Sequence, residues 1–215
     1  MEIELRTERP EDYRETENVT REAFWNHFVP GCCEHYLLHI MRDCPAFLPE
    51  LDIVAVYDGS IVGNVICTKS VVKGDDGKEY EVLGLGPISV LPAYQGKGIG
   101  GKLIARVQEL ARERGDRGIF LYGDPDYYGR HGFTAAERFG IRTSDDYFAD
   151  ALQGCELYEG ALSDMRGRYV EDAVFGIDPA AVDLFDRQFP PKEKVSGTPS
   201  QKRFTEIAAR RKNAK

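Results

Sequence analysis

The stretch LGLGPISVLPAYQGKGIGGKLIARVQELARERGDRGIFLYGDPDYYGRHGF, residues 83–133, decides the fold of this chain. An apolar run up to Leu91 predicts a strand, and a glycine-rich segment, 95–101, follows it after a short link that contains proline. Apolar residues then recur with a helical period, at positions 99, 103, 104, 107, 110 and 111. Residues 118–122 predict a second buried strand. The unit is therefore strand, glycine loop, helix, strand.

The glycine segment has the properties of an anion-binding site. The first turn of a helix leaves backbone N–H groups unpaired, and the peptide dipoles place partial positive charge there. Gly96, Gly98, Gly100 and Gly101 would let a ligand approach the backbone, and Lys97 adds a positive charge. These residues predict a phosphate cradle. The alternative is a glycine-rich turn that only packs a helix on a sheet, because the pattern alone is weak.

Gly96, Gly98 and Gly101 also fit the G-x-G-x-x-G fingerprint of dinucleotide-binding folds. That fold requires the glycines to end a strand directly and the sheet to be parallel. Here residues 92–95 intervene, and hairpins are expected to join the preceding strands. The sequence therefore disfavours a dinucleotide-binding fold.

Two motifs stand at a defined separation within residues 83–133. The first is Gln-Gly-x-Gly-x-Gly after a strand that ends Ile-Ser-Val-Leu-Pro, and the second is Tyr-Tyr-Gly-Arg-His-Gly-Phe after the next strand. Together they resemble the GNAT superfamily of acyl-CoA-dependent N-acetyltransferases, and the order of elements fits from residue 2 to about 160. The motif Gly-Asp-Pro-x-Tyr-Tyr-Gly-Arg resembles that of a bacterial subgroup of predicted acetyltransferases. The resemblance implies an α/β fold with a mixed, mostly antiparallel sheet flanked by helices, and acetyl-CoA as cosubstrate.

The resemblance also implies a cofactor site and one catalytic residue. The glycine loop would bind the pyrophosphate of coenzyme A, the bulged strand around Pro87 would pair with its pantetheine amides, and free N–H groups near the bulge would polarise the acetyl carbonyl. Tyr128 would be the general acid. Asp124 stands where family members commonly carry Asn, and an ionised Asp accepts hydrogen bonds but cannot donate them. The expected cofactor-binding residues are Ile88, Ser89, Val90, Gln95, Gly96, Lys97, Gly98, Ile99, Gly100, Gly101, Asp124 and Tyr128.

The expected activity is transfer of an acetyl group from acetyl-CoA to a primary amine by direct attack. The acceptor, a small molecule or a protein amine, is left open, since the fold does not decide it. The general base is also open among Glu22, Glu79, Glu81, Asp52 and an ordered water. The alternative function is a non-catalytic acyl-CoA sensor or interaction module on the same fold.

The rest of the chain predicts an acetyltransferase domain over residues 1–176 and a C-terminal helical extension with a basic tail over 177–215. Trp25, Phe28, Tyr36 and Phe47 would either line the acceptor site or fill the core. The expected helices cover about 10–27, 33–42, 125–131 and 178–187, and the expected strands cover 3–5, 51–57, 61–72, 80–91, 133–139 and part of 152–158. Residues 160–176 read as loop and short strand and are not placed.

Charge is unevenly distributed along the chain. The formal net charge is −8, but residues 190–215 carry eight Lys or Arg and two Glu, so the first 189 residues are strongly acidic. Such a body disfavours nucleic acid as a partner. The basic tail is either mobile or an amphipathic helix, with Phe204, Ile207 and Ala208 on one side, docked on its own body or on a second subunit; the acidic body favours docking. A monomer or a homodimer is expected.

Cysteine and histidine spacing predicts neither disulfides nor a metal site. The five cysteines are odd in number and irregularly spaced. His35 and His39 are four residues apart, but no metal-binding motif surrounds them. No apolar run approaches the ~20 residues of a membrane span, and the first residues lack an apolar signal region. The expected location is the cytoplasm, away from membranes.

Overall fold

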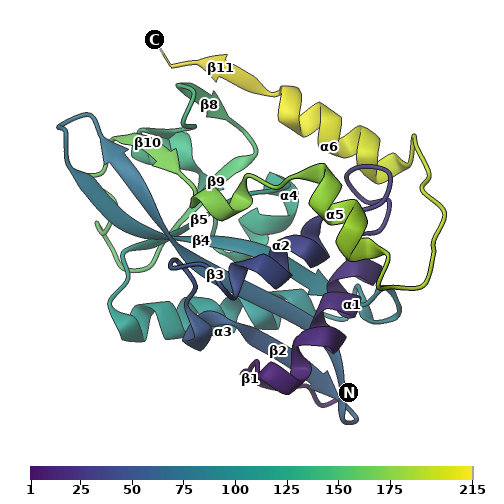
Figure 1. Cartoon of the computed structure of the whole chain (residues 1–215). Helices are drawn as coiled ribbons and strands as arrows, with labels where there is room; N and C mark the ends of the chain where they lie inside the picture. The colour runs from purple at the N-terminus through teal and green to yellow at the C-terminus, as the bar shows by residue number, and fades with distance from the viewer. Residues whose placement is uncertain (215) are drawn as a thin grey trace.

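The computed structural model describes residues 1–214 and contains, within them, a nine-stranded mixed sheet with helices on both faces (Figure 1). The elements are β1 (Glu4–Thr7), α1 (Tyr13–Phe24), α2 (Glu34–Met41), β2 (Ile53–Tyr57), β3 (Ser60–Gly74), β4 (Glu79–Val90), α3 (Ile99–Arg114), β5 (Gly118–Tyr122), α4 (Pro125–Tyr128), β6 (Thr134–Ala135), β7 (Ile141–Arg142), β8 (Tyr147–Ala149), β9 (Leu152–Glu156), β10 (Gly167–Val170), α5 (Pro179–Asp186), α6 (Pro199–Ala209) and β11 (Arg211–Asn213).

The sheet has the order β1-β2-β3-β4-β5-β9-β6, and β10 pairs with the end of β3 that lies beyond β2. The pairs β4–β5 and β7–β10 are parallel, and the other pairs of the sheet are antiparallel. A separate ribbon joins β8 to β11. The predicted α/β fold, with a mixed and mostly antiparallel sheet flanked by helices, is confirmed.

The strands divide the core into two layers, because successive side chains point to opposite faces of the sheet. On β2, Ile53 and Ala55 pack with α3, whereas Val54 packs with Val19 of α1. α1 and α2 therefore cover one face and α3 covers the other (Figure 1). The apolar stripe of α3 is buried at Ile99, Leu103, Ile104, Val107 and Ala111, as its periodicity predicts.

The sheet opens between β4 and β5. These strands pair only through Leu83 with Ile119 and Gly84 with Phe120, although β4 continues to Val90. Pro87 lies in the widening part, after a cis peptide bond, where the register between β3 and β4 shifts. Proline has no N–H to contribute to a ladder, so the bulge predicted at this position is confirmed. The opening leaves one edge of β4 unpaired by its neighbour.

Two regions differ from the sequence prediction. The strand expected over 133–139 is only the two-residue β6, since the chain turns at once into a 3-10 helix, Ala136–Phe139, that Gly140 ends in a left-handed conformation. The first long helix ends at Phe24, about three residues early, and Asn26 adopts a φ of 60° just beyond it. Residues 160–176, which the sequence left unplaced, contain β10.

The basic tail docks on its own chain. Residues 192–214 run back past α1, α4 and β8, and α6 lies along this path (Figure 1, yellow). The preference for docking over a mobile tail is thereby confirmed. The proposed domain division after residue 176 stays a prediction, although α5 packs on α1 through the buried Arg21, whose guanidinium binds the Asp186 carboxylate at 2.6 Å.

Candidate active site

A cavity of about 680 Å³ lies where β4 and β5 separate. Its walls come from the end of α1, the last residues of β4, the loop that opens α3, and the segment after β5. Ten of the twelve residues predicted to bind the cofactor line it, the exceptions being Ser89 and Lys97. The structure therefore brings residues from two separate sequence motifs into one site.

The start of α3 presents free backbone donors to this cavity. Gly98 caps the helix in a left-handed conformation with φ of 80°, and no side chain caps the helix in its place. Within residues 1–214, the N–H groups of Ile99, Gly100 and Gly101 form no hydrogen bond. A Cβ added at Gly96 or Gly98 would meet no atom within 4 Å. The helix start is therefore open space with N–H groups and a favourable dipole for an anion.

Gly100 and Gly101 have a different role from Gly96 and Gly98. The Tyr127 hydroxyl lies where a Cβ on Gly100 would stand, and the His131 ring lies 2.8 Å from the corresponding position on Gly101. These two glycines let the segment that begins with α4 pack directly on the first turn of α3. The four glycines thus divide into two that shape the loop and two that allow close packing.

The unpaired edge of β4 carries backbone groups toward the gap. The Leu91 N–H donates to the Val62 carbonyl at 2.9 Å, which makes that pair hydrogen-bonded. Hydrogen-bonded and non-hydrogen-bonded pairs alternate along an antiparallel ladder, so Ile88 and Val90 direct their backbone groups away from β3. The Val90 carbonyl accepts from the Gln95 side chain at 3.0 Å. The N–H and carbonyl of Ile88 and the N–H of Val90 therefore face the gap.

Ser89 alternates to the opposite face of the sheet. Its side chain is buried, and its hydroxyl lies 3.1 Å from the Thr20 hydroxyl of α1. The side chain therefore belongs to the contact between sheet and helix. A cofactor contact at Ser89 stays a prediction and could involve only its backbone.

Tyr128 is partly buried at the wall of the cavity. Its ring packs against Phe133, with ring centroids 5.7 Å apart, and lies so close to Gly123 that a Cβ there would overlap it. Burial raises the pKa of Tyr128 above its ordinary value, so the phenol is protonated at neutral pH. Its hydroxyl has no hydrogen-bond partner within the described residues 1–214. A protonated donor therefore stands in the cavity wall.

Asp124 is held as an ionised acceptor. Its side chain caps α4 by accepting from the Asp126 N–H at 2.9 Å. Arg203 of α6 donates to both of its carboxylate oxygens, at 2.9 and 3.0 Å. This hydrogen bonding with Arg203 lowers the pKa of Asp124. Sequence reasoning singled out Asp124 but missed Arg203, because no local signal links two residues so far apart.

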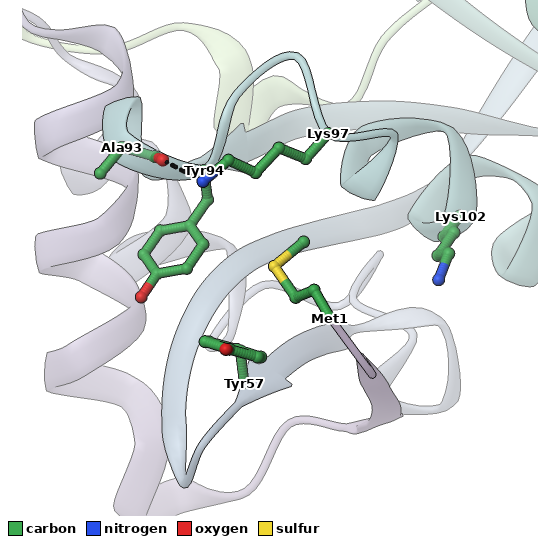
Figure 2. Close-up of a pocket in the computed structure, with 6 residues that line it drawn as sticks. All are labelled: Met1, Tyr57, Ala93, Tyr94, Lys97 and Lys102. Carbon is green, nitrogen blue, oxygen red and sulfur yellow. Dashed lines mark hydrogen bonds between the residues drawn. The ribbon is translucent and has the colours of Figure 1, made fainter.

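Lys97 does not point into the cavity. Its ammonium group donates to the Ala93 carbonyl at 2.9 Å and, together with Met1, Tyr57, Tyr94 and Lys102, lines a second and more open hollow of about 780 Å³ (Figure 2). The α3 backbone is thus the source of positive potential at the cavity, and the predicted cofactor contact of Lys97 stays a prediction.

The aromatic residues proposed for the acceptor wall separate in the structure. Phe28 lines the cavity, whereas Trp25 lies under the Arg21 guanidinium, Tyr36 packs on Phe185, and Phe47 packs in the core beside α2. Phe24, His27 and Tyr122, which sequence reasoning did not select, also line it. Aromatic residues at the end of α1, three and four apart, were the signal that could have found the first two.

None of the four candidate bases lines the cavity. Glu79 lies at the far end of the β3–β4 hairpin beside Lys73, with Glu81 close by on β4, and Glu22 binds Lys192. Asp52 is buried against Asn64, and burial, reinforced by the Glu8 carboxylate, raises its pKa. The general base therefore stays open.

Residues 1–214 contain no group of three or more His, Cys, Asp or Glu side chains placed to hold a metal ion. In the same residues, no helix combines the length and the apolar character needed to cross a bilayer.

Two strands that separate beside the glycine-rich N-terminus of a helix are typical of an acetyltransferase fold. Comparison with known proteins gives the same fold. The family described as Acetyltransferase (GNAT) family matches residues 6–140. The chain therefore belongs to the GNAT acetyltransferase family.

Relatives with curated descriptions are uncharacterized N-acetyltransferases of Escherichia coli (strain K12). YhbS is 28% identical over 164 residues, which cover 76% of this chain and 92% of YhbS. YjhQ is 40% identical over 86 residues, which cover 40% of this chain and 46% of YjhQ, so the match spans less than half of that relative.

The fold of this chain resembles two crystal structures over most of the chain's length. The structure of E. coli YhbS in complex with CoA has a TM-score of 0.72 and 25% identity, and the match covers 81% of this chain and 92% of that one. A GNAT family acetyltransferase from Brucella melitensis in complex with acetyl-CoA has a TM-score of 0.65 and 33% identity, covering 81% and 98%.

Proposed function

We propose that this chain transfers the acetyl group of acetyl-CoA to a primary amine. The observation that carries the proposal is the meeting, in one cavity, of the free N–H groups at the start of α3 and the unpaired edge of β4. The open space at Gly96 and Gly98 fits a phosphate group, and the β4 edge fits the amides of an extended ligand. Complexes of two relatives with CoA or acetyl-CoA support the same assignment.

In this proposal the residues of the chain divide the work of binding and catalysis. The N–H groups of residues 99–101 bind the pyrophosphate, and Ile88 and Val90 pair with the pantetheine arm. Acetyl-CoA supplies the activated thioester. The N–H of Ile88, beside the bulge, stabilises negative charge on the carbonyl oxygen, as an oxyanion hole does. The acceptor nitrogen, deprotonated, attacks directly, and Tyr128 donates a proton to the departing thiolate.

The test measures binding and turnover separately. Calorimetry with CoA and acetyl-CoA should give a single site, and release of free thiol from acetyl-CoA should rise with particular members of a panel of amines. Mass spectrometry should then find the acetylated amine. Tight binding of acetyl-CoA without turnover of any amine would favour the non-catalytic sensor. Absence of binding would remove the assignment of the cavity.

A further inference from the structure

The C-terminal segment, residues 192–214, is anchored first at the turn that follows α1. The Asn26 carbonyl accepts from Thr198 at 3.1 Å and from Gln201 at 3.2 Å, and its side-chain oxygen accepts from the Val195 N–H at 3.0 Å. The Trp25 indole donates to the Glu193 carbonyl at 2.9 Å. The left-handed conformation of Asn26 therefore serves the docking of the segment as well as the end of α1.

The second anchor joins opposite sides of the cavity through adjacent residues of α6. Phe204 packs on Phe28 at the α1 side, with ring centroids 5.0 Å apart. Arg203 binds Asp124 at the β5 side and also donates to Asp126 at 2.6 Å. Phe28 and Asp124 both line the cavity. The helix therefore bridges the two walls between which an acceptor would approach.

The third anchor lies beyond the cavity. β11 pairs antiparallel with β8, and Arg211 and Lys212 form ion pairs with Asp145 and Glu137. The segment thus continues across the molecule after it leaves the cavity, held at both ends of α6 (Figure 1). A chain held at both ends leaves its place less readily than one held at a single point.

We propose that residues 192–214 restrict the acceptor to small amines and exclude protein and peptide lysines. The inference rests on the proposed acetyl transfer. A lysine within a polypeptide needs room for chain on both sides of it, and α6 crosses between the walls where that chain would lie. Arg203 is a positioning residue that holds the Asp124 segment against α6, and Phe204 holds α6 against Phe28 of the opposite wall.

The aromatic wall indicates which small amines fit. Phe24, Phe28 and Tyr122 line the cavity with rings, and the negative charge of Asp124 is already paired with Arg203. Aromatic rings pack on apolar and aromatic carbon, and no lining residue among 1–214 supplies an unpaired carboxylate for further ammonium groups. The structure therefore favours an amine with an aromatic or apolar body over a polyamine.

Bisubstrate conjugates test this inference without requiring turnover. Calorimetry would compare CoA, CoA joined through an acetyl bridge to phenethylamine, and CoA joined in the same way to the central lysine of a nine-residue peptide. We expect the full-length protein to bind the phenethylamine conjugate at least as tightly as CoA. The peptide conjugate should bind about tenfold weaker or worse, because it must displace α6.

The double variant Arg203→Ala, Phe204→Ala removes both contacts from half-exposed positions, so the fold should be kept. It should bring the affinity for the peptide conjugate to within about threefold of that for the phenethylamine conjugate, while CoA binds as before. Lys202→Ala, an exposed neighbour on the same helix, is the matched control and should leave the preference unchanged. The emission of Trp25, the single tryptophan, reports whether the segment has undocked.

Equal affinity of the wild-type protein for the two conjugates would overturn the inference, and so would a double variant that keeps the full preference. Failure of CoA itself to bind would overturn the proposed function and this inference with it. The CoA arm thus separates the two failures.

Discussion

The hydroxyl of Tyr128 combines the two properties that a general acid needs, a proton at neutral pH and a position in the cavity wall. Tyr128→Phe removes the proton and keeps the ring that packs on Phe133. We expect kcat to fall by ~10²–10⁴-fold with little change in the KM for acetyl-CoA, because the contact forms in the transition state.

Steady-state kinetics on the best amine of the panel checks this prediction. Tyr127→Phe is the internal control and should be milder, since that hydroxyl packs over Gly100. If Tyr128→Phe retained activity within about threefold of wild type while chemistry limits the rate, the acid would be water rather than Tyr128.

Gly98 lies where the cavity meets the start of α3, and its φ of 80° disfavours any side chain. Gly98→Glu should abolish CoA binding, since the carboxylate adds like charge in the open space beside the free N–H groups. Gly98→Ala separates the causes, because it carries the backbone cost without the charge. Calorimetry on both folded variants is the measurement; normal CoA binding by the Gly98→Glu variant would remove the pyrophosphate from this loop.

Glu171, next to β10, carries a pH dependence of stability. Burial raises the pKa of this carboxyl from 4.5 to about 7. Its contribution to stability is therefore complete below pH 4.5 and is lost as the pH rises through 7. Glu171→Gln should leave the Tm unchanged at pH 4.5 and raise the free energy of unfolding by about 1–3 kcal/mol at pH 8.

Thermal unfolding of wild type and variant across this pH range tests the prediction. Glu113→Gln, at an exposed position of α3, is the control and should give a profile parallel to that of wild type. Parallel profiles for Glu171→Gln as well would show that the carboxyl titrates normally.

Among the elements, α5 depends on one buried ion pair. Arg21 of α1 is fully buried and binds Asp186 with two hydrogen bonds, at 2.6 and 3.2 Å. Burial opposes the charge of Asp186, but the hydrogen bond and charge of Arg21 outweigh it and lower the pKa. Asp186→Ala should destabilise the protein by about 3–5 kcal/mol, because the buried Arg21 then keeps only the Glu22 carboxylate, at 4.0 Å, as an ionic partner.

Urea unfolding measures this loss. Asp183→Ala is the comparison on the same helix, since its ion pair with Lys194 is exposed and should be worth less than about 1 kcal/mol. Equal effects of the two variants would mean that Arg21 finds another partner or water.

The elements that the sequence predicted well are those whose signal is local. The apolar period of α3, the glycine at its start and the turn at Asp58–Gly59 depend on neighbours within a few residues. The pairing of β10 with β3 joins segments almost a hundred residues apart, and nothing in the sequence of either strand names its partner. The same applies to the basic tail. The charge difference predicted that it docks, but nothing in the sequence indicated where on the body it docks.

The candidate site divides in the same way. Gly98 and Tyr128 belong to motifs whose residue types already indicate what they can do, namely bind an anion and donate a proton. Arg203, Phe204 and Tyr122 acquire their place only when distant segments meet, so reading along the chain could not select them. Ser89 and Lys97 show the converse, since they belong to the motifs but direct their side chains elsewhere.

At the scale of the whole molecule, a basic C-terminal segment packs against an acidic body and closes over it. Residues 190–215 carry an excess of positive charge, and their ion pairs reach Glu22, Asp183, Asp124, Asp145 and Glu137. Most of these pairs are exposed, so each contributes little and salt weakens them. The closure depends on their number and on the hydrogen bonds at Asn26.

Amide hydrogen exchange should resolve this closure as a separate cooperative unit. Hydrogen bonds at Asn26 span 169 and 175 residues of sequence, and few buried side chains support α6. We expect the amides of α6 and β11 to exchange through local opening, and to exchange faster at high salt. The amides of β3 and β4 should exchange only through global unfolding. Equal protection of α6 and β4 would contradict this. On this expectation the C-terminal segment leaves and regains its place many times before the sheet unfolds once.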